Sequence, residues 1–93
     1  MDKKIINSVL IFKALADETR IKIIDSLLEE SKTVTQIVTV IGESQSGVSH
    51  QLKFLKEANI VKSVRKGRCI YYSLADEHVR KIVTQTFLHA SEV

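Results

Sequence analysis

Residues 33–58 read TVTQIVTVIGESQSGVSHQLKFLKEA, and this stretch holds two candidate helices separated by one tight turn. The β-branched residues of its first half favour a strand by propensity alone. Its apolar positions nevertheless recur at helical spacing, at Val34, Ile37, Val38 and Ile41. Thr33 and Gln36 have the spacing of a capping box, and Gly42 stands where a glycine ends a helix. We therefore predict a short helix over residues 33–41.

The second half predicts a longer helix, from a cap at Ser44 to about Ala58. Its inward face consists of Val48, Leu52 and Leu55, and its outer face carries Gln45, Ser46, Ser49, His50 and Lys53. Because a tight turn containing a glycine joins the two helices, the pair is typical of a helix-turn-helix motif. Such a motif presents short polar side chains to the base edges of double-stranded DNA. A solvated helix face is the alternative interpretation.

A basic hairpin after this motif favours DNA. Strand patterns over residues 61–65 and 68–73 flank Lys66-Gly67, a two-residue connection whose glycine tolerates positive φ. Arg65, Lys66 and Arg68 cluster around this turn, where cations suit phosphates or a narrow minor groove. A hairpin in this position is a wing. We therefore predict a mainly α fold with a small β-hairpin, a winged helix-turn-helix that binds double-stranded DNA.

Helical patterns flank the motif on both sides. Residues 3–16 form a helix that is apolar most of the way round, so we expect a partner subunit to cover it. Asp17 caps a second helix, which runs to the polar loop at residues 29–32. Asp76 starts the last helix, whose apolar stripe is Val79, Val83, Phe87 and Ala90. We expect a single domain over residues 1–93 that forms a homodimer through its first and last helices.

Composition narrows the function classes. A chain of 93 residues with 44% hydrophobic content can close one small core, and its net charge of +3 permits an anionic partner. No segment approaches the ~20 apolar residues of a membrane span. The start resembles a secretory signal, but Asn7 and Ser8 interrupt its apolar stretch, so we expect a structural helix there. A single cysteine, Cys69, fits a cytoplasmic location, and we expect it to be a buried structural thiol.

Metal-ligating side chains lie at both ends of the last helix. Asp76 and His78 stand at one end, while His89 and Glu92, three positions apart, share a face at the other. A helix places His78 and His89 about 16 Å apart along its axis, so no single ion can bridge them. If two such helices pack antiparallel about a two-fold axis, two symmetric sites form between the chains. Two imidazoles and two carboxylates suit zinc, cobalt could occupy the same cage, and soft ions such as cadmium are disfavoured.

Simpler interpretations exist for the same residues. Asp76 could only cap the helix, the two histidines could lie on a polar surface, and Glu92 could be a frayed terminal residue. The protein could then be a repressor with a vestigial metal site and another signal, or a winged-helix module for protein interactions. An enzyme is the least favoured class, because four protein ligands leave the metal no open position for substrate or water.

Three stretches resemble the ArsR/SmtB family of metal-sensing repressors. They are SQSGVSHQLKFLK at residues 44–56, FKALADETR at residues 12–20 and RCIYYSL at residues 68–74. The resemblance implies a dimer built from the first and last helices, operator binding by the metal-free form, and control of metal efflux or sequestration genes. It also implies that the sensor site is that of the zinc branch, formed on the last helix by Asp76, His78, His89 and Glu92.

Departures from the family pattern refine this expectation. Residues 33–41 lack the cysteine pair that thiophilic-metal sensors carry there, and the extra ligands that nickel and cobalt sensors recruit near their chain ends are missing. Gly47 stands where the family usually has a side chain, and it should cost about 1 kcal/mol of helix propensity relative to Ala. The resemblance also implies that the second ring nitrogen of His89 hydrogen-bonds a backbone carbonyl near Asn59. This contact would couple metal binding to DNA binding.

Overall fold

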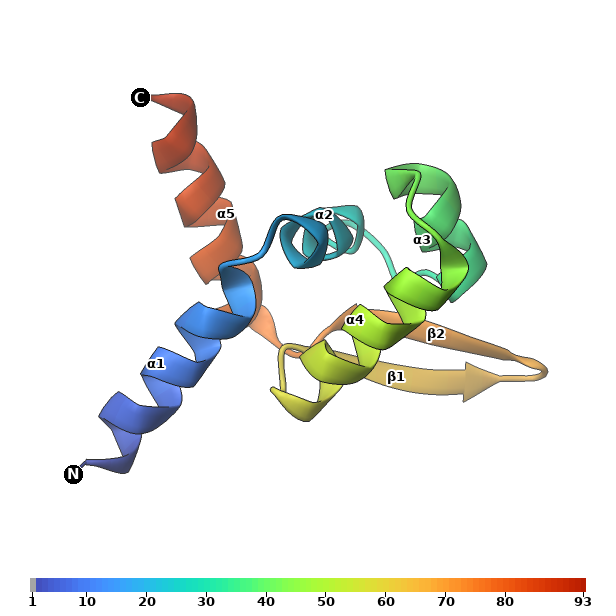
Figure 1. Ribbon diagram of the computed structural model, residues 1–93, viewed down its shortest axis with the longest axis horizontal. Helices are drawn as coiled ribbons and strands as arrows, with labels where there is room; N and C mark the ends of the chain where they lie inside the picture. Colours follow the sequence, from blue (N-terminus) through green and yellow to red (C-terminus); the bar gives the residue numbers. More distant parts are fainter. Residues whose placement is uncertain (1) are drawn as a thin grey trace.

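The computed structural model describes residues 2–93 and consists of five helices and a two-stranded hairpin (Figure 1). In chain order the elements are α1 (Lys3–Leu15), α2 (Glu18–Ser26), α3 (Val34–Ile41), α4 (Gln45–Glu57), β1 (Val61–Lys66), β2 (Cys69–Leu74) and α5 (Glu77–Ser91). The pair α3 and α4 forms the helix-turn-helix, and the antiparallel hairpin follows it as the wing. The predicted winged helix-turn-helix fold is confirmed.

Side-chain caps determine where α3 begins and ends. Gln36 Oε1 accepts a bond from the Thr33 backbone N–H at 2.9 Å, and Thr33 Oγ1 accepts one from the Gln36 N–H at 3.2 Å, which completes the predicted capping box. Gly42 ends the helix in the left-handed region, with φ 73°. Ile37 is fully buried. These local bonds and the buried face outweigh the β propensity of the segment, so the segment is a helix.

One hydrophobic core joins the helices to the root of the wing. Its buried members are Ala14, Ile23, Ile24, Leu27, Ile37, Val48, Leu52, Leu55, Ile60, Val61, Leu74 and Val83. α2 contributes two of these residues and α4 three, whereas α1 buries only Ala14 and α5 only Val83. The first and last helices therefore lie at the margin of the core. Among the helices of residues 2–93, none is long and apolar enough to cross a membrane.

The hairpin turn lies one residue further along than the sequence predicts. Lys66 pairs with Cys69, so the connecting residues are Gly67 and Arg68 instead of Lys66 and Gly67. Gly67 has φ 64° and Arg68 does not have positive φ, which is the pattern of a type II′ turn with its glycine in first place. The prediction of a buried thiol is also wrong: Cys69 directly follows this turn at the tip of the wing and is exposed.

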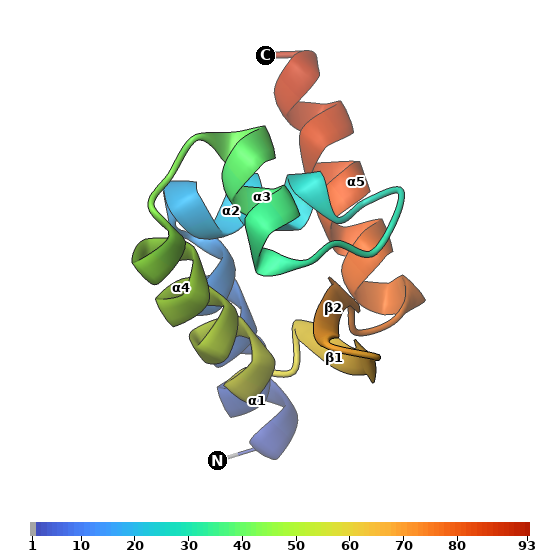
Figure 2. The same cartoon turned by 90° about the vertical axis from the view of Figure 1, so that its right-hand side faces the viewer.

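A backbone bridge ties the wing to the loop between α2 and α3. The Lys32 N–H donates to the Tyr72 carbonyl at 2.9 Å, and the Tyr72 N–H donates to the Lys32 carbonyl at 2.7 Å. Lys32 Nζ also donates to the Ser26 carbonyl at 2.6 Å. Figure 2 looks along the wing, with α4 to its left and α5 to its right. The root of the wing is thus held by bonds in addition to the strand pairing, while its tip projects freely.

Candidate nucleic-acid interface and metal half-sites

The candidate reading surface is the solvent side of α4. Ser44 caps the helix by accepting a bond from the Gly47 N–H at 3.1 Å. Val48, Leu52 and Leu55 are fully buried on the inner side. The five predicted DNA-contacting residues of this helix are all exposed, and they are Gln45, Ser46, Ser49, His50 and Lys53. The outer face of the second helix of the motif is therefore available to a groove of DNA.

The N-terminal cap of α4 explains why a glycine occurs at position 47. Gly47 is the third residue of α4, in the first turn, where the cap lies. A Cβ added at this position would lie 2.9 Å from Ser44 Oγ, the atom that accepts the Gly47 N–H. The expected cost of about 1 kcal/mol refers to a helix interior. In the first turn, glycine instead leaves room for the capping side chain.

The second cationic surface is the tip of the wing. Arg65, Lys66 and Arg68 are all exposed there, as the sequence predicts. Lys66 Nζ lies 5.5 Å from the centre of the Tyr71 ring, within cation–π range. Arg65 and Lys66 are consecutive in β1 and point to opposite faces of the hairpin, while Arg68 stands in the turn. Positive charge therefore surrounds the tip on both faces.

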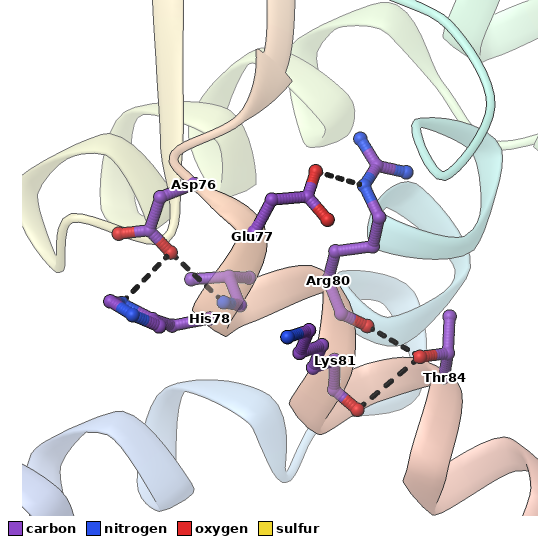
Figure 3. A network of polar contacts seen from close by, with 7 residues as sticks. Asp76, Glu77, His78, Arg80, Lys81 and Thr84 are labelled. Carbon is purple, nitrogen blue, oxygen red and sulfur yellow. Dashed lines mark hydrogen bonds and ion pairs between the residues drawn. The ribbon is translucent and has the colours of Figure 1, made fainter.

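The first half of the candidate metal site lies at the start of α5. Asp76 caps this helix, because its Oδ1 accepts a bond from the Val79 N–H at 3.0 Å (Figure 3). His78 Nδ1 lies 3.9 Å from the same oxygen, too far for a hydrogen bond. Both side chains are open to solvent, and the imidazole is 91% exposed. Asp76 thus serves as a helix cap while its second oxygen, Oδ2, and the imidazole of His78 are free to bind a ligand.

A groove of about 490 Å³ begins at these two residues and runs between three elements. Its walls include Leu10 of α1, the N-cap Asp76 and His78 in the first turn of α5, and Asn59, which follows the C-cap of α4. Asn59 turns the chain toward the wing in the left-handed region, with φ 61°. The groove therefore connects the first half-site with the end of the reading helix.

The second half-site lies at the opposite end of α5. His89 is exposed in the last turn and lines a shallow hollow with Thr86 and Ala90. Glu92 forms the end cap of the helix, where its backbone N–H donates to the His89 carbonyl at 3.0 Å. Within residues 2–93 of one chain, no three His, Cys, Asp or Glu side chains gather where they could hold a metal ion. One chain presents two separate pairs of candidate ligands.

Apolar side chains remain uncovered on the two marginal helices. Phe12 of α1 is 64% exposed and Leu10 is 56% exposed, and Leu88 of α5 is 58% exposed. The other large apolar residues exposed on these helices are Ile5, Ile6, Val9 and Ile82. An apolar surface of this kind, spread over neighbouring helices, marks an interaction site.

Sequence reasoning assigned no role to Arg20, although its side chain contacts two other helices. Its guanidinium bonds carbonyls at the end of α1 and the side chain of Gln51 in α4. A single arginine in an amphipathic helix gives no local signal of such contacts, because they join residues up to 31 positions apart.

Comparison with known proteins gives a consistent family. The sequence model described as "Bacterial regulatory protein, arsR family" matches residues 17–63. The chain is 44% identical over 84 residues to a cadmium resistance transcriptional regulatory protein CadC homolog of Staphylococcus aureus, covering 89% of this chain and 69% of that one. It is 38% identical over 81 residues to a transcriptional repressor SmtB homolog of Synechocystis, covering 87% of this chain and 61% of the relative.

Solved structures give the same fold. The homodimeric winged helix-turn-helix DNA-binding domain of Mb0332 from Mycobacterium bovis, a possible ArsR-family transcriptional regulator, superposes with a TM-score of 0.91 at 29% identity. The superposition covers 99% of this chain and 88% of that domain. The likeness therefore includes the first and last helices as well as the reading helix and the wing.

Proposed function

Because the chain belongs to the arsR family of bacterial regulatory proteins, we propose that it is a zinc-responsive transcriptional repressor. In this proposal its metal-free homodimer binds operator DNA in the cytoplasm and is released by zinc, with cobalt as a second effective ion. The regulated genes would serve metal efflux or sequestration. One observation carries the proposal: the groove that holds Asp76 and His78 also reaches Asn59 at the end of the reading helix.

DNA binding is supported by the two exposed surfaces. Gln45 and Ser46 in the first turn of α4 can hydrogen-bond base edges in the major groove. Lys53, further along the helix, and the cations of the wing can neutralise phosphates. Phosphate contacts fix the register of the protein on the duplex and base contacts supply the sequence preference, so the two surfaces have separate tasks.

A homodimer is supported by the uncovered apolar residues of α1 and α5. The relative from Mycobacterium bovis is a homodimer and resembles this chain over nearly its whole length. A two-fold interface built from Leu10, Phe12 and Leu88 would remove from water side chains that a monomer leaves more than half exposed. It would also place two reading helices on one duplex.

The donor set favours zinc. Asp76 and His78 of one subunit and His89 and Glu92 of its partner would hold the ion, which would link the two subunits when bound. Nitrogen and carboxylate ligands suit zinc and cobalt, whereas cadmium prefers thiolates. The one thiol of the chain, Cys69, lies at the tip of the wing as the first residue of β2, and the rest of that strand separates it from the start of α5. Its position argues against a part in this site.

The groove supplies a physical route from the site to the reading helix. Asn59 directly follows the C-cap of α4, so a contact of the partner subunit's His89 with a backbone carbonyl near Asn59 would act on the end of that helix. A dimer held in this way would fit the operator poorly. Linkage then requires DNA to weaken zinc binding by the same factor by which zinc weakens DNA binding.

Operator binding with and without zinc tests the proposal. The probe is a palindromic duplex that the wild-type protein selects from a random-sequence pool, and the readout is fluorescence anisotropy in a metal chelator and in excess zinc. We expect zinc to weaken binding by about 5- to 150-fold, the usual range of allosteric coupling. An affinity that zinc leaves unchanged would show that the metal site is vestigial. Failure to bind DNA, or binding without salt dependence, would favour a protein-interaction module.

A further inference from the structure

Arg20 holds the end of the first helix. It lies in the first turn of α2, and its Nε donates to the Ala14 carbonyl at 2.6 Å while its Nη2 donates to the Lys13 carbonyl at 3.2 Å. Both carbonyls lie in the last turn of α1, where the bonds within the helix run out, and that of Lys13 also accepts the N–H of the C-cap residue Ala16 at 3.3 Å. A cation at this end of a helix also interacts favourably with the helix dipole. The guanidinium therefore fixes α1 against α2.

The same guanidinium contacts the reading helix. Its Nη1 donates to Gln51 Oε1 at 3.2 Å, and its central carbon lies 4.4 Å from the centre of the Phe54 ring. Gln51 and Phe54 are three positions apart and share one face of α4. The exposed reading residues His50 and Lys53 directly precede them in the sequence. Arg20 thus bonds α1 and α4 at the same time.

The position of Arg20 itself is fixed by its backbone. Its N–H donates to Asp17 Oδ2 at 3.0 Å, in the cap of α2. A guanidinium is planar and offers five N–H donors in a fixed fork, so it can serve two helices with one rigid group. A lysine at this position would have one mobile ammonium and could not reproduce that arrangement. The contact therefore depends on arginine as such and not on positive charge alone.

We propose that Arg20 is the positioning residue that sets the angle of α4 relative to α1. It thereby sets the spacing that the dimer accepts between the two half-sites of the operator DNA. This inference rests on the proposed function, in which α1 forms the dimer interface and α4 reads the DNA. In a symmetric dimer the separation of the two reading helices has to match the separation of the two half-sites of the DNA. One inserted base pair moves a half-site by about 3.4 Å along the duplex. A stiff joint between α1 and α4 makes that mismatch costly.

Spacing discrimination is the quantity that tests this role. The probes are the selected palindrome and the same palindrome with one base pair inserted at its centre, and the readout is the ratio of their dissociation constants. Gln51→Ala removes the hydrogen bond to α4 and leaves the contact with the Phe54 ring, and Arg20→Lys keeps the charge without the fork. We expect each variant to lower the ratio about five- to tenfold, in line with the net contribution of one ordinary hydrogen bond. The double variant should be no worse than the more affected single variant.

Lys22→Gln is the matched control. Lys22 lies on the same helix, but its ammonium makes only long ion pairs, at 4.0 Å to Glu18 and 3.7 Å to Glu43. This variant should discriminate spacing as the wild type does. Circular dichroism checks folding, and if Arg20→Lys unfolds, Gln51→Ala decides alone, because it leaves the bonds to α1 in place. If Gln51→Ala weakens binding to both probes equally, so that the ratio is unchanged, the positioning role is wrong. Absence of DNA binding by the wild type would instead contradict the proposed function.

Discussion

Exchange of subunits between His78→Ala and His89→Ala dimers should restore zinc binding that neither variant has alone. α5 is one continuous helix, so it separates the two histidines by about 16 Å along its axis. Two nitrogen ligands of one zinc ion lie within about 4 Å of each other, since each bond is about 2 Å long. The two histidines of one chain therefore cannot serve the same ion, and each homodimeric variant loses one ligand from both sites.

A heterodimer of the two variants has one damaged and one intact site. The damaged site lacks both histidines, whereas the intact site has wild-type Asp76 and His78 from one chain and His89 and Glu92 from the other. Random exchange makes about half of the dimers mixed, so the mixture should bind about one quarter of the wild-type amount of tight zinc. Isothermal titration measures the stoichiometry, and native mass spectrometry verifies that heterodimers are present.

The third histidine provides the control. His50 lies on the reading face of α4, and His50→Ala should bind the full wild-type amount of zinc. If the exchanged mixture binds no more zinc than the two parents while heterodimers are present, the site is not shared between chains. The reasoning from the length of α5 would then be wrong.

Four further variants test the same surfaces. Phe12→Lys places a charge on the exposed face of α1 and should give a 10.5 kDa monomer in sedimentation equilibrium; a dimer would show that this face lies outside the interface. Gln45→Ala should relax base preference by about 1–3 kcal/mol if its contact is bidentate. Arg68→Ala should instead weaken binding to all sequences and reduce the slope of log affinity against log salt concentration by about one. An unchanged slope would exclude the wing from DNA contact. Asp76→Asn should keep the cap of α5 and the melting temperature while zinc affinity falls, because Asn caps helices as well as Asp; unchanged zinc affinity would mean that Asp76 only caps the helix.

Local signals predicted most of the fold. The start and end of α3 are set by the capping box of Thr33 and Gln36 and by the glycine at Gly42. These signals act over a few residues of the chain, so the bounds of the helix can be read from the sequence. The turn was predicted one residue too early because Lys66-Gly67 and Gly67-Arg68 both contain the required glycine. Only the pairing of the strands shows that Gly67 takes the first position of the turn.

Features that depend on tertiary contacts were not predictable. The exposure of Cys69 follows from the displaced turn, since a residue that directly follows the turn has no core above it. Arg20 bonds residues from two other helices, and no periodicity in the sequence encodes that arrangement. For the candidate metal site, the structure places the four candidate residues in two pairs at the two ends of α5. In the proposed dimer, how the pairs meet depends on a second chain.

Asn59 has the only positive φ of a non-glycine residue within residues 2–93. The left-handed conformation costs most residues about 1–2 kcal/mol, and Gly, Asn and Asp are the ones that adopt it readily. A mutational scan would therefore find that few amino acids are tolerated at this position, even though its side chain is exposed and lies outside the reading surface. Because Asn59 joins α4 to β1, a residue that avoids this conformation, such as a β-branched one, would shift the reading helix and the wing relative to each other. In the proposed function, substitutions among the exposed residues of α4 can therefore change DNA specificity, whereas substitution of Asn59 would change how the reading helix and the wing lie relative to each other.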